Sequence, residues 1–250
     1  MSIKKHIPNI ITLGNLFSGL MAVLLILNGQ YVWAGFFTFL GAFFDFFDGM
    51  VARLLGVSGE LGKQMDSLAD MVSFGVVPGM AMFAMLKMAN ADLANDVFYA
   101  NENLNILLHT DTVYALPGFL ITLFSALRLA KFNIDTRQTS SFVGVPTPAI
   151  TLFILSIFLI SVLKQDELVE RMIATPWILY LITISASYLL VAELPLFAMK
   201  FKVWNWQDNR IRWVFVAIVV LLLAIFQLVA VPLIIIVYVL LSLINNLLEE

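Results

Sequence analysis

Four aspartates lie close together in an otherwise apolar part of the sequence, at positions Asp45, Asp48, Asp66 and Asp70. The first two are three residues apart and the last two are four apart, so each pair shares one face if its segment is helical. Two such helices, facing each other, would aim all four carboxylates at one place. Carboxylates at membrane depth are costly and repel one another, and divalent cations relieve both effects. The spacing therefore predicts a hard-cation site built from these four side chains.

Small residues and one arginine lie between the two aspartate pairs, at Gly49, Ala52, Arg53 and Gly62. Small side chains let a ligand approach a helix backbone closely, and arginine offers a planar, bidentate partner for phosphate. Together with acidic metal ligands, this set favours a diphosphate–metal complex as the ligand. A hydroxyl that attacks such a diphosphate needs a base, and Asp70 is our candidate for it. We therefore expect Asp70 to be the most weakly metal-bound of the four.

The composition is that of an integral membrane protein. Of 250 residues, 61% are hydrophobic and 12% are charged, where a soluble domain has about 25% charged residues. Apolar segments of about 18 to 25 residues predict an all-α, polytopic bundle rather than a barrel. The net charge of -3 argues against a nucleic-acid partner, and the absence of cysteine excludes disulfides and thiolate metal sites.

We predict about eight membrane spans in a single domain that covers residues 1–250. No cleavage site follows the first apolar run, so we keep that run as a span. A break at Ala230–Pro232 separates the last two spans, and residues 90–111 are predicted to form an exposed polar loop. The predicted spans cover residues 10–28, 31–55, 62–87, 113–133, 146–163, 176–197, 212–228 and 230–246.

The basic residues predict the orientation, because cytoplasmic loops carry the excess of lysine and arginine. Three basic residues fall on one side, at Lys87, Lys164 and Arg171, and the other eleven of the 14 fall on the opposite side. This asymmetry places both termini and the aspartates at the cytoplasmic face of the cell (inner) membrane. The eleven are Lys4, Lys5, Arg53, Lys63, Arg128, Lys131, Arg137, Lys200, Lys202, Arg210 and Arg212.

The complete pattern from Asp45 to Asp70 is D-x2-D-G-x2-A-R-x8-G-x3-D-x3-D, without a departure. It resembles the signature of the CDP-alcohol phosphatidyltransferases, membrane enzymes that move a phosphatidyl or similar group from a CDP-linked donor to an alcohol and release CMP. The resemblance implies two divalent ions, Mg²⁺ or Mn²⁺, held by Asp45, Asp48, Asp66 and Asp70, with Asp70 also taking the proton of the acceptor. It further implies a homodimer, a catalytic part in residues 1–165 and additional spans without the signature in residues 176–250. A P-N-x-x-T element at residues 8–12 is also similar to this family. The residues implied to contact the CDP donor are Asn9, Thr12, Asp48, Gly49, Ala52, Arg53, Gly62 and Ser67.

Three further segments resemble the phosphatidylserine synthase branch of the family. They are D-S-L-A-D-M-V-S-F-G at 66–75, R-L-A-K-F-N at 128–133, where Lys131 replaces the usual arginine, and F-V-G-V-P-T-P-A at 142–149. The resemblance implies CDP-diacylglycerol as donor and L-serine as acceptor. A bidentate arginine suits the serine carboxylate, so Arg128 is the main acceptor candidate, unless it binds lipid phosphate at the interface. The other acceptor candidates are Ser73, Lys131, Asn133, Gly144, Pro146 and Thr147. The segment 144–148 is predicted to be non-helical, either capping the fifth span or lining the acceptor pocket.

Two alternatives stay open. The same chemistry can use glycerol 3-phosphate or an inositol phosphate as acceptor, although a phosphorylated acceptor calls for more cationic residues than Arg128 and Lys131. A cation-coupled transporter also uses carboxylates within the membrane. That alternative gives no role to Arg53, Gly49 and Gly62 at their spacings, and no inverted repeat is visible.

Overall fold

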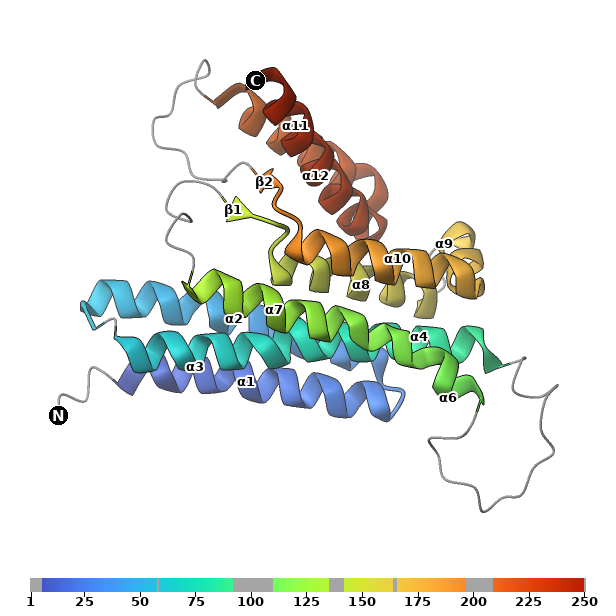
Figure 1. Cartoon of the computed structure of the whole chain (residues 1–250), viewed down its shortest axis with the longest axis horizontal. Helices are drawn as coiled ribbons and strands as arrows, with labels where there is room; N and C mark the ends of the chain where they lie inside the picture. The colour runs from blue at the N-terminus through green and yellow to red at the C-terminus, as the bar shows by residue number, and fades with distance from the viewer. Residues whose placement is uncertain are drawn as a thin grey trace.

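The computed structural model describes residues 6–57, 59–91, 110–134, 142–163, 166–196 and 209–249, and over these ranges the chain is a bundle of helices with one short strand pair (Figure 1). It confirms the predicted polytopic, helical membrane fold. The helices are α1 (His6–Leu27), α2 (Tyr31–Leu55), α3 (Glu60–Asp70), η2 (Met71–Val76), α4 (Val77–Ala89), α6 (Thr110–Ala115), η4 (Leu116–Phe119), α7 (Leu120–Ile134), α8 (Thr147–Val162), α9 (Glu167–Ile173), α10 (Pro176–Val191), α11 (Arg210–Phe226), η6 (Gln227–Val229) and α12 (Ala230–Glu249). Strands β1 (Phe142–Val143) and β2 (Pro195–Leu196) pair antiparallel.

Glycine turns reverse the chain on either side of α2. Gly29, with φ +70°, lies between α1 and α2, and Gly56, with φ +62°, ends α2 in the left-handed conformation. Two backbone hydrogen bonds close the end of α2. Gly56 N donates to Arg53 O at 3.2 Å, and Val57 N donates to Ala52 O at 3.1 Å. This is a Schellman arrangement, which glycine favours because it has no Cβ. The turn brings α3 back alongside the aspartate-bearing end of α2.

The third predicted span, residues 62–87, lies within one helical stretch, Glu60–Ala89, and this stretch contains a π-helical turn. Helix α3 passes at Asp70 into the π-helical turn η2, and α4 continues from Val77 to Ala89. A π turn bonds each N–H to the carbonyl five residues earlier, and such turns are rare and common at functional sites. The predicted α-helical period is therefore interrupted directly after the last of the four aspartates.

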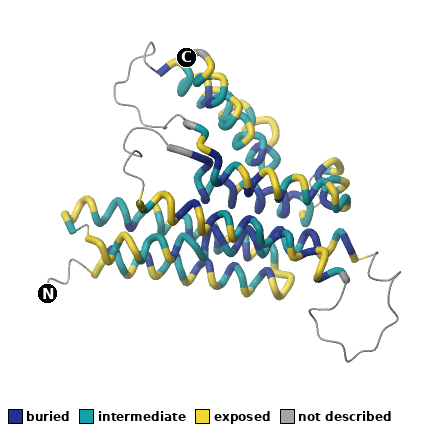
Figure 2. Tube along the Cα trace, in the orientation of Figure 1, coloured by how far each residue is buried: buried dark blue, intermediate teal, exposed yellow. Residues whose placement is uncertain are grey.

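The core of the bundle lies where α4, α8 and α10 meet, and the most buried stretches of the trace run through these helices (Figure 2). Fully buried side chains include Met82 and Met85 of α4, Ile154 and Phe158 of α8, and Leu179 of α10. The aspartates lie on α2 and α3, and α1 packs against both of these helices. Figure 1 shows the three helices side by side. Helix α3, which carries Asp66 and Asp70, continues through η2 into α4, and α4 is part of this core.

Five helical stretches of the described chain are long and apolar enough to cross a membrane, or six if α8 and α9, which meet at 109°, form one broken span. All eight predicted segments are helical, but α10 has only 16 residues, and the stretch Arg210–Leu247 folds back on itself as the packed pair α11 and α12 (Figure 1). The break in that pair is at Gln227, with φ +49°, rather than at Ala230–Pro232 as predicted.

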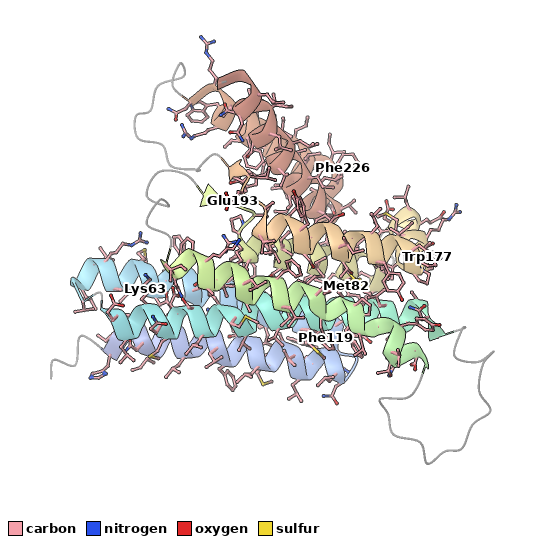
Figure 3. All side chains as sticks on the ribbon, viewed as in Figure 1. Lys63, Met82, Phe119, Trp177, Glu193 and Phe226 are labelled. Atoms are coloured by element: carbon pink, nitrogen blue, oxygen red, sulfur yellow. The ribbon has the colours of Figure 1, made fainter. Side chains whose placement is uncertain are left out.

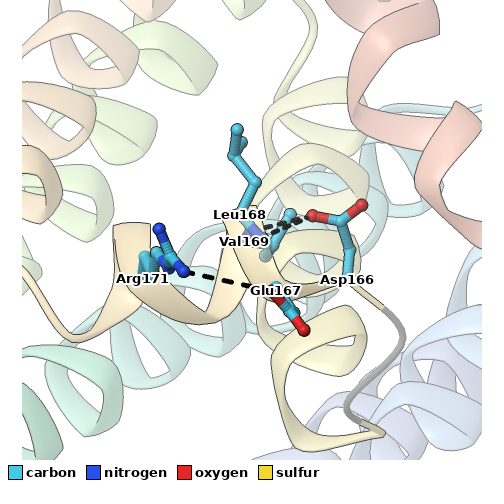
Figure 4. Close-up of polar contacts among 5 residues, drawn as sticks. All are labelled: Asp166, Glu167, Leu168, Val169 and Arg171. Carbon is cyan, nitrogen blue, oxygen red and sulfur yellow. Dashed lines mark hydrogen bonds and ion pairs between the residues drawn. The ribbon is translucent and has the colours of Figure 1, made fainter.

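Helix α9 begins with a side-chain cap (Figure 4). The Asp166 carboxylate accepts hydrogen bonds from Leu168 N at 2.9 Å and Val169 N at 3.0 Å, and Arg171 pairs with Glu167 at 4.0 Å. The cap satisfies backbone donors that would otherwise have no partner in this short helix.

Several residues used in the predictions lie outside the described ranges. They are residues 92–109 of the predicted polar loop and, among the basic residues counted for orientation, Lys4, Lys5, Arg137, Lys164, Lys200 and Lys202.

Candidate active site

The antiparallel helices α2 and α3 bring three of the four aspartates together. Carboxylate oxygens of Asp45, Asp48 and Asp66 all lie within 4.8 Å of one another. The Asp45 carboxyl is also within hydrogen-bonding reach of Asp70, which does not belong to the three-oxygen group. Asp48 is 5% exposed and the other three aspartates are half-buried, so these negative groups are partly withdrawn from water as well as close to each other.

Carboxylate oxygens clustered in this way fit a hard divalent cation. Such ions take oxygen ligands, and their charge offsets both the mutual repulsion and the loss of hydration of the aspartates. The chain has no cysteine, and no histidine of the described residues belongs to the cluster, so a softer metal is not favoured. The cluster of Asp45, Asp48 and Asp66 can therefore bind a metal ion.

Helix α1 supplies a hydrogen-bond partner to an aspartate of each pair. The Thr12 hydroxyl donates to Asp48 Oδ2 at 2.6 Å, and it also lies 3.1 Å from Pro8 O. Asn15 Nδ2 donates to Asp70 Oδ1 at 3.3 Å. Asn15 is fully buried, and its Oδ1 has no hydrogen-bond partner among the described residues. Sequence reasoning placed Thr12 at the site and gave Asn15, one turn further along, as a weaker candidate contact of the nucleotide, whereas in the structure Asn15 bonds Asp70.

A cavity of about 390 Å³ opens beside the acidic cluster, between the start of α1, the end of α2 and the start of α3. Its lining contains seven of the eight residues predicted to contact the CDP donor, namely Asn9, Thr12, Asp48, Gly49, Ala52, Arg53 and Gly62. Asp66 is also in the lining, so the cavity and the candidate metal site adjoin each other.

The glycines of the motif leave room on this lining. A Cβ added at Gly49 would have no heavy atom within 4 Å, and one added at Gly62 would lie 3.6 Å from Asn9 Oδ1. Arg53 is exposed, and its Nε donates to Gly49 O at 3.0 Å, one turn earlier in α2. A bare helix face next to an arginine at the rim is suited to a phosphate-bearing ligand.

Lys63 is a lining residue that the sequence analysis did not assign to the site. It lies at the α2–α3 end of the bundle (Figure 3), and its Nζ donates to Asn133 O at 3.1 Å. Its position directly after Gly62 was the available signal. Pro8, Val57 and Gly59 are further lining residues that the sequence analysis did not single out.

Ser67 does not line the cavity in which the other predicted donor residues meet. Its hydroxyl exchanges hydrogen bonds with the side chain of Asn133, at 2.8 Å from Nδ2 and 3.2 Å from Oδ1. Ser67 and Asn133 therefore tie α3 to the end of α7, so a predicted donor residue and a predicted acceptor residue contact each other.

Arg128 lies within α7, 8% exposed and near enough to Asp70 for an electrostatic interaction. Its guanidinium carbon is 5.9 Å from the centre of the Phe132 ring, and its Nε has no hydrogen-bond partner among the described residues. A buried guanidinium with unused donor capacity is suited to an anionic ligand. Lys131, on the same helix, is exposed.

The remaining acceptor candidates make structural contacts. Ser73 is fully buried and donates to Asn15 O at 3.1 Å. Gly144, with φ +78°, packs against the last carbonyls of α10, and its N–H donates to Leu194 O at 3.0 Å. Pro146 precedes α8, and the buried Thr147 is its first residue, so the non-helical segment ends at Pro146 rather than at Pro148 as predicted. A proline in the first turn of a helix is favoured because its missing N–H would have no helical partner there.

Comparison with known proteins gives one family match. A model of the family described as CDP-alcohol phosphatidyltransferase matches residues 5–192 of this chain. The match therefore includes α1 to α10 and stops before α11 and α12.

Individual relatives align over somewhat more than half of the chain. A CDP-diacylglycerol–serine O-phosphatidyltransferase of Bacillus subtilis is 35% identical over 144 residues, which cover 58% of this chain and 70% of that protein. The Helicobacter pylori (strain J99) protein of the same name is 32% identical over 57% of this chain and 52% of its own length. An archaetidylserine synthase of Methanothermobacter thermautotrophicus is 33% identical over 61% of this chain and 58% of its own length. The chain thus spans little more than half the length of the latter two relatives.

Proposed function

The chain belongs to the CDP-alcohol phosphatidyltransferase family, and we propose that it transfers the phosphatidyl group of CDP-diacylglycerol to the hydroxyl of L-serine, giving phosphatidylserine and CMP. The observation that carries this proposal is the cavity in which Asn9, Thr12, Gly49, Ala52 and Arg53 meet beside the acidic cluster. The relatives named for serine transfer support the choice of acceptor.

In this proposal two Mg²⁺ or Mn²⁺ ions are held by Asp45, Asp48 and Asp66, with Asp70 as the weakest ligand. When bound, the ions supply charge neutralisation for the diphosphate and for the leaving CMP. Arg53 and Lys63 contribute positive charge at the rim of the donor cavity, and the glycine face of α2 lets the diphosphate approach the helix backbone.

The chemical step exchanges one phosphorus–oxygen bond for another. The serine hydroxyl oxygen forms a bond to the phosphatidyl phosphorus, the bond from that phosphorus to the CMP oxygen breaks, and the hydroxyl proton passes to Asp70. Asp70 suits this role because it lies beside the three-oxygen group without belonging to it, and Asn15 holds its Oδ1. Arg128 binds the serine carboxylate in this arrangement, and its proximity to Asp70 supports that placement.

We further propose that the active site faces the cytoplasm from the cell (inner) membrane, and that the enzyme is a homodimer. The excess of basic residues on the side of the aspartates supports the orientation. Residues 1–165 would form the catalytic part and residues 176–250 the additional spans. Lipid tails would enter between helices from the bilayer, while serine enters from the aqueous side.

The test is product formation by the purified protein in detergent. With CDP-diacylglycerol and Mg²⁺ or Mn²⁺, radiolabelled serine should enter phosphatidylserine and CMP should be released in equal amount. Glycerol 3-phosphate and inositol phosphate, offered at the same concentration, should give no comparable release. Serine-independent CMP release, or faster turnover with a phosphorylated acceptor, would overturn the assignment of serine.

A further inference from the structure

The π-helical turn η2 is bonded to three neighbouring helices by side-chain hydroxyls. Ser73 of the turn donates to Asn15 O of α1 at 3.1 Å. Thr122 of α7 donates to Gly75 O at 2.9 Å, and Thr151 of α8 lies 3.1 Å from Phe74 O and 2.9 Å from Thr147 O of its own helix. Two carbonyls and one hydroxyl of the turn thus have hydrogen-bond partners on three other helices.

Glycines allow these helices to approach the turn. A Cβ at Gly79 would overlap Thr122 Oγ1, and a Cβ at Gly75 would lie 3.2 Å from Ser125 Cβ. These two glycines are four residues apart and face α7, as in the small-residue contacts of membrane helices. On the other side, a Cβ at Gly19 of α1 would lie 2.5 Å from Ser73 Oγ. The turn is therefore held closely as well as hydrogen-bonded.

The turn begins immediately after Asp70, and Asn15 connects the two. Asn15 Nδ2 donates to Asp70 Oδ1, while its main-chain oxygen accepts from Ser73. Because η2 joins α3 rigidly to the core helix α4, its geometry determines where α3 directs Asp66 and Asp70. A change in the turn would rotate these carboxylates relative to Asp45 and Asp48 on α2.

We propose that the clamped turn η2 positions Asp66 and Asp70 against the α2 aspartates, and that Thr122 and Thr151 are positioning residues of the transfer site although neither lines the donor cavity. This inference rests on the proposed function, because it assigns the turn a part in that reaction. It predicts that two threonines on different helices affect metal binding through the same turn.

The experiment compares Thr122→Val with Thr122→Ser in the full-length protein in detergent. Thr183→Val is the control: Thr183 is fully buried, as Thr151 is, whereas Thr122 is half-buried, and the Thr183 hydroxyl bonds only Leu179 O of its own helix, at 2.7 Å. Mn²⁺ affinity is measured calorimetrically without substrates, and kcat, KM and melting temperature are measured separately.

Thr122→Val should weaken Mn²⁺ binding and lower kcat by about fivefold each, the effect of losing one partly buried hydrogen bond. Thr122→Ser should restore both, and the KM for serine should change less than kcat. Thr151→Val should have a similar but smaller effect, because its hydroxyl also has a partner in its own helix. Thr183→Val should leave Mn²⁺ affinity and kcat within about twofold of the unmodified protein.

The inference is overturned if Thr122→Val and Thr151→Val differ from Thr183→Val only in melting temperature, since that result is a purely structural effect. Should Thr122→Val fail to fold, the Mn²⁺ affinity of Thr151→Val, compared with that of Thr183→Val, decides the question. Failure of the proposed function looks different: the unmodified protein then binds Mn²⁺ but does not convert serine, and the Mn²⁺ titrations still test the clamp.

Discussion

Replacing Thr12 by valine removes the shortest side-chain hydrogen bond at the candidate metal site while nearly preserving the volume of the side chain. Thr12 Oγ1 and Asp48 Oδ2 are 2.6 Å apart, which is within the range of a hydroxyl bonded to a charged carboxylate. Thr12 is 4% and Asp48 5% exposed, so valine leaves Asp48 Oδ2 without its protein donor in a largely buried position. Loss of a hydrogen bond that orients a metal ligand typically weakens metal binding by about 10- to 100-fold. We expect a decrease of that size in the Mn²⁺ affinity of Thr12→Val.

The assay is calorimetric titration of the detergent-solubilised protein with Mn²⁺, followed by the Mn²⁺ dependence of CMP release. Thr12→Ser keeps the hydroxyl and should stay within about threefold of the unmodified protein. Thr38→Val controls for the isosteric exchange, because Thr38 is equally buried and donates only to Ala34 O within α2. If Thr12→Val binds Mn²⁺ as tightly as Thr38→Val, the hydrogen bond from Thr12 does not orient Asp48 for metal binding, and the prediction is wrong.

Three further substitutions test separate roles. Asp70→Asn should reduce turnover by about 10²- to 10⁴-fold, because the lost carboxylate accepts the proton of the acceptor. Binding of the CDP donor should stay largely intact. An unchanged rate in single-turnover measurements would exclude Asp70 as the base. Asp45→Asn should weaken Mn²⁺ and CDP-diacylglycerol binding together, since Asp45 lies in the three-oxygen cluster; loss of turnover with both affinities retained would contradict that placement. Arg128→Ala should raise the KM for serine at least about tenfold more than the KM for CDP-diacylglycerol, with Arg128→Lys intermediate; the reverse order would assign Arg128 to the donor.

The sequence predicted the helices from the lengths of their apolar segments, and the spacing of Gly49, Ala52, Arg53 and Gly62 correctly indicated that these residues share one cavity. Apolar segments of membrane-spanning length determine the helices, and α2 and α3 are consecutive helices joined by a short glycine-containing connection. Residues at helical spacing on two adjacent antiparallel helices therefore face each other in only one way. Gly49, Arg53 and Gly62 consequently line the same cavity as Asp48 and Asp66.

Other features of the site depend on contacts with helices that are distant in the sequence, and the spacing of residues within one helix does not predict these contacts. Ser67 shares the D-S-L-A-D segment with Asp66 and Asp70, yet its hydroxyl bonds Asn133 of α7. Ser73 was predicted to bind the acceptor, but it is buried against the backbone of α1. Asn15 has no signature of its own in the sequence, and its role follows only from its contact with Asp70.

The π turn shows why a correctly predicted span can still conceal the geometry of its site. The residues of η2, Met71–Val76, have the composition of an ordinary apolar helix, so periodicity alone predicts an uninterrupted α-helix there. What favours the π turn is external: hydroxyls of Thr122 and Thr151, far away in the sequence, bond its carbonyls. Because an i→i+5 turn changes the rotation between its flanks, the direction of Asp70 is set partly by α7 and α8. The acidic motif therefore specifies which side chains meet, whereas the helices packed behind it determine how closely Asp70 approaches the other three.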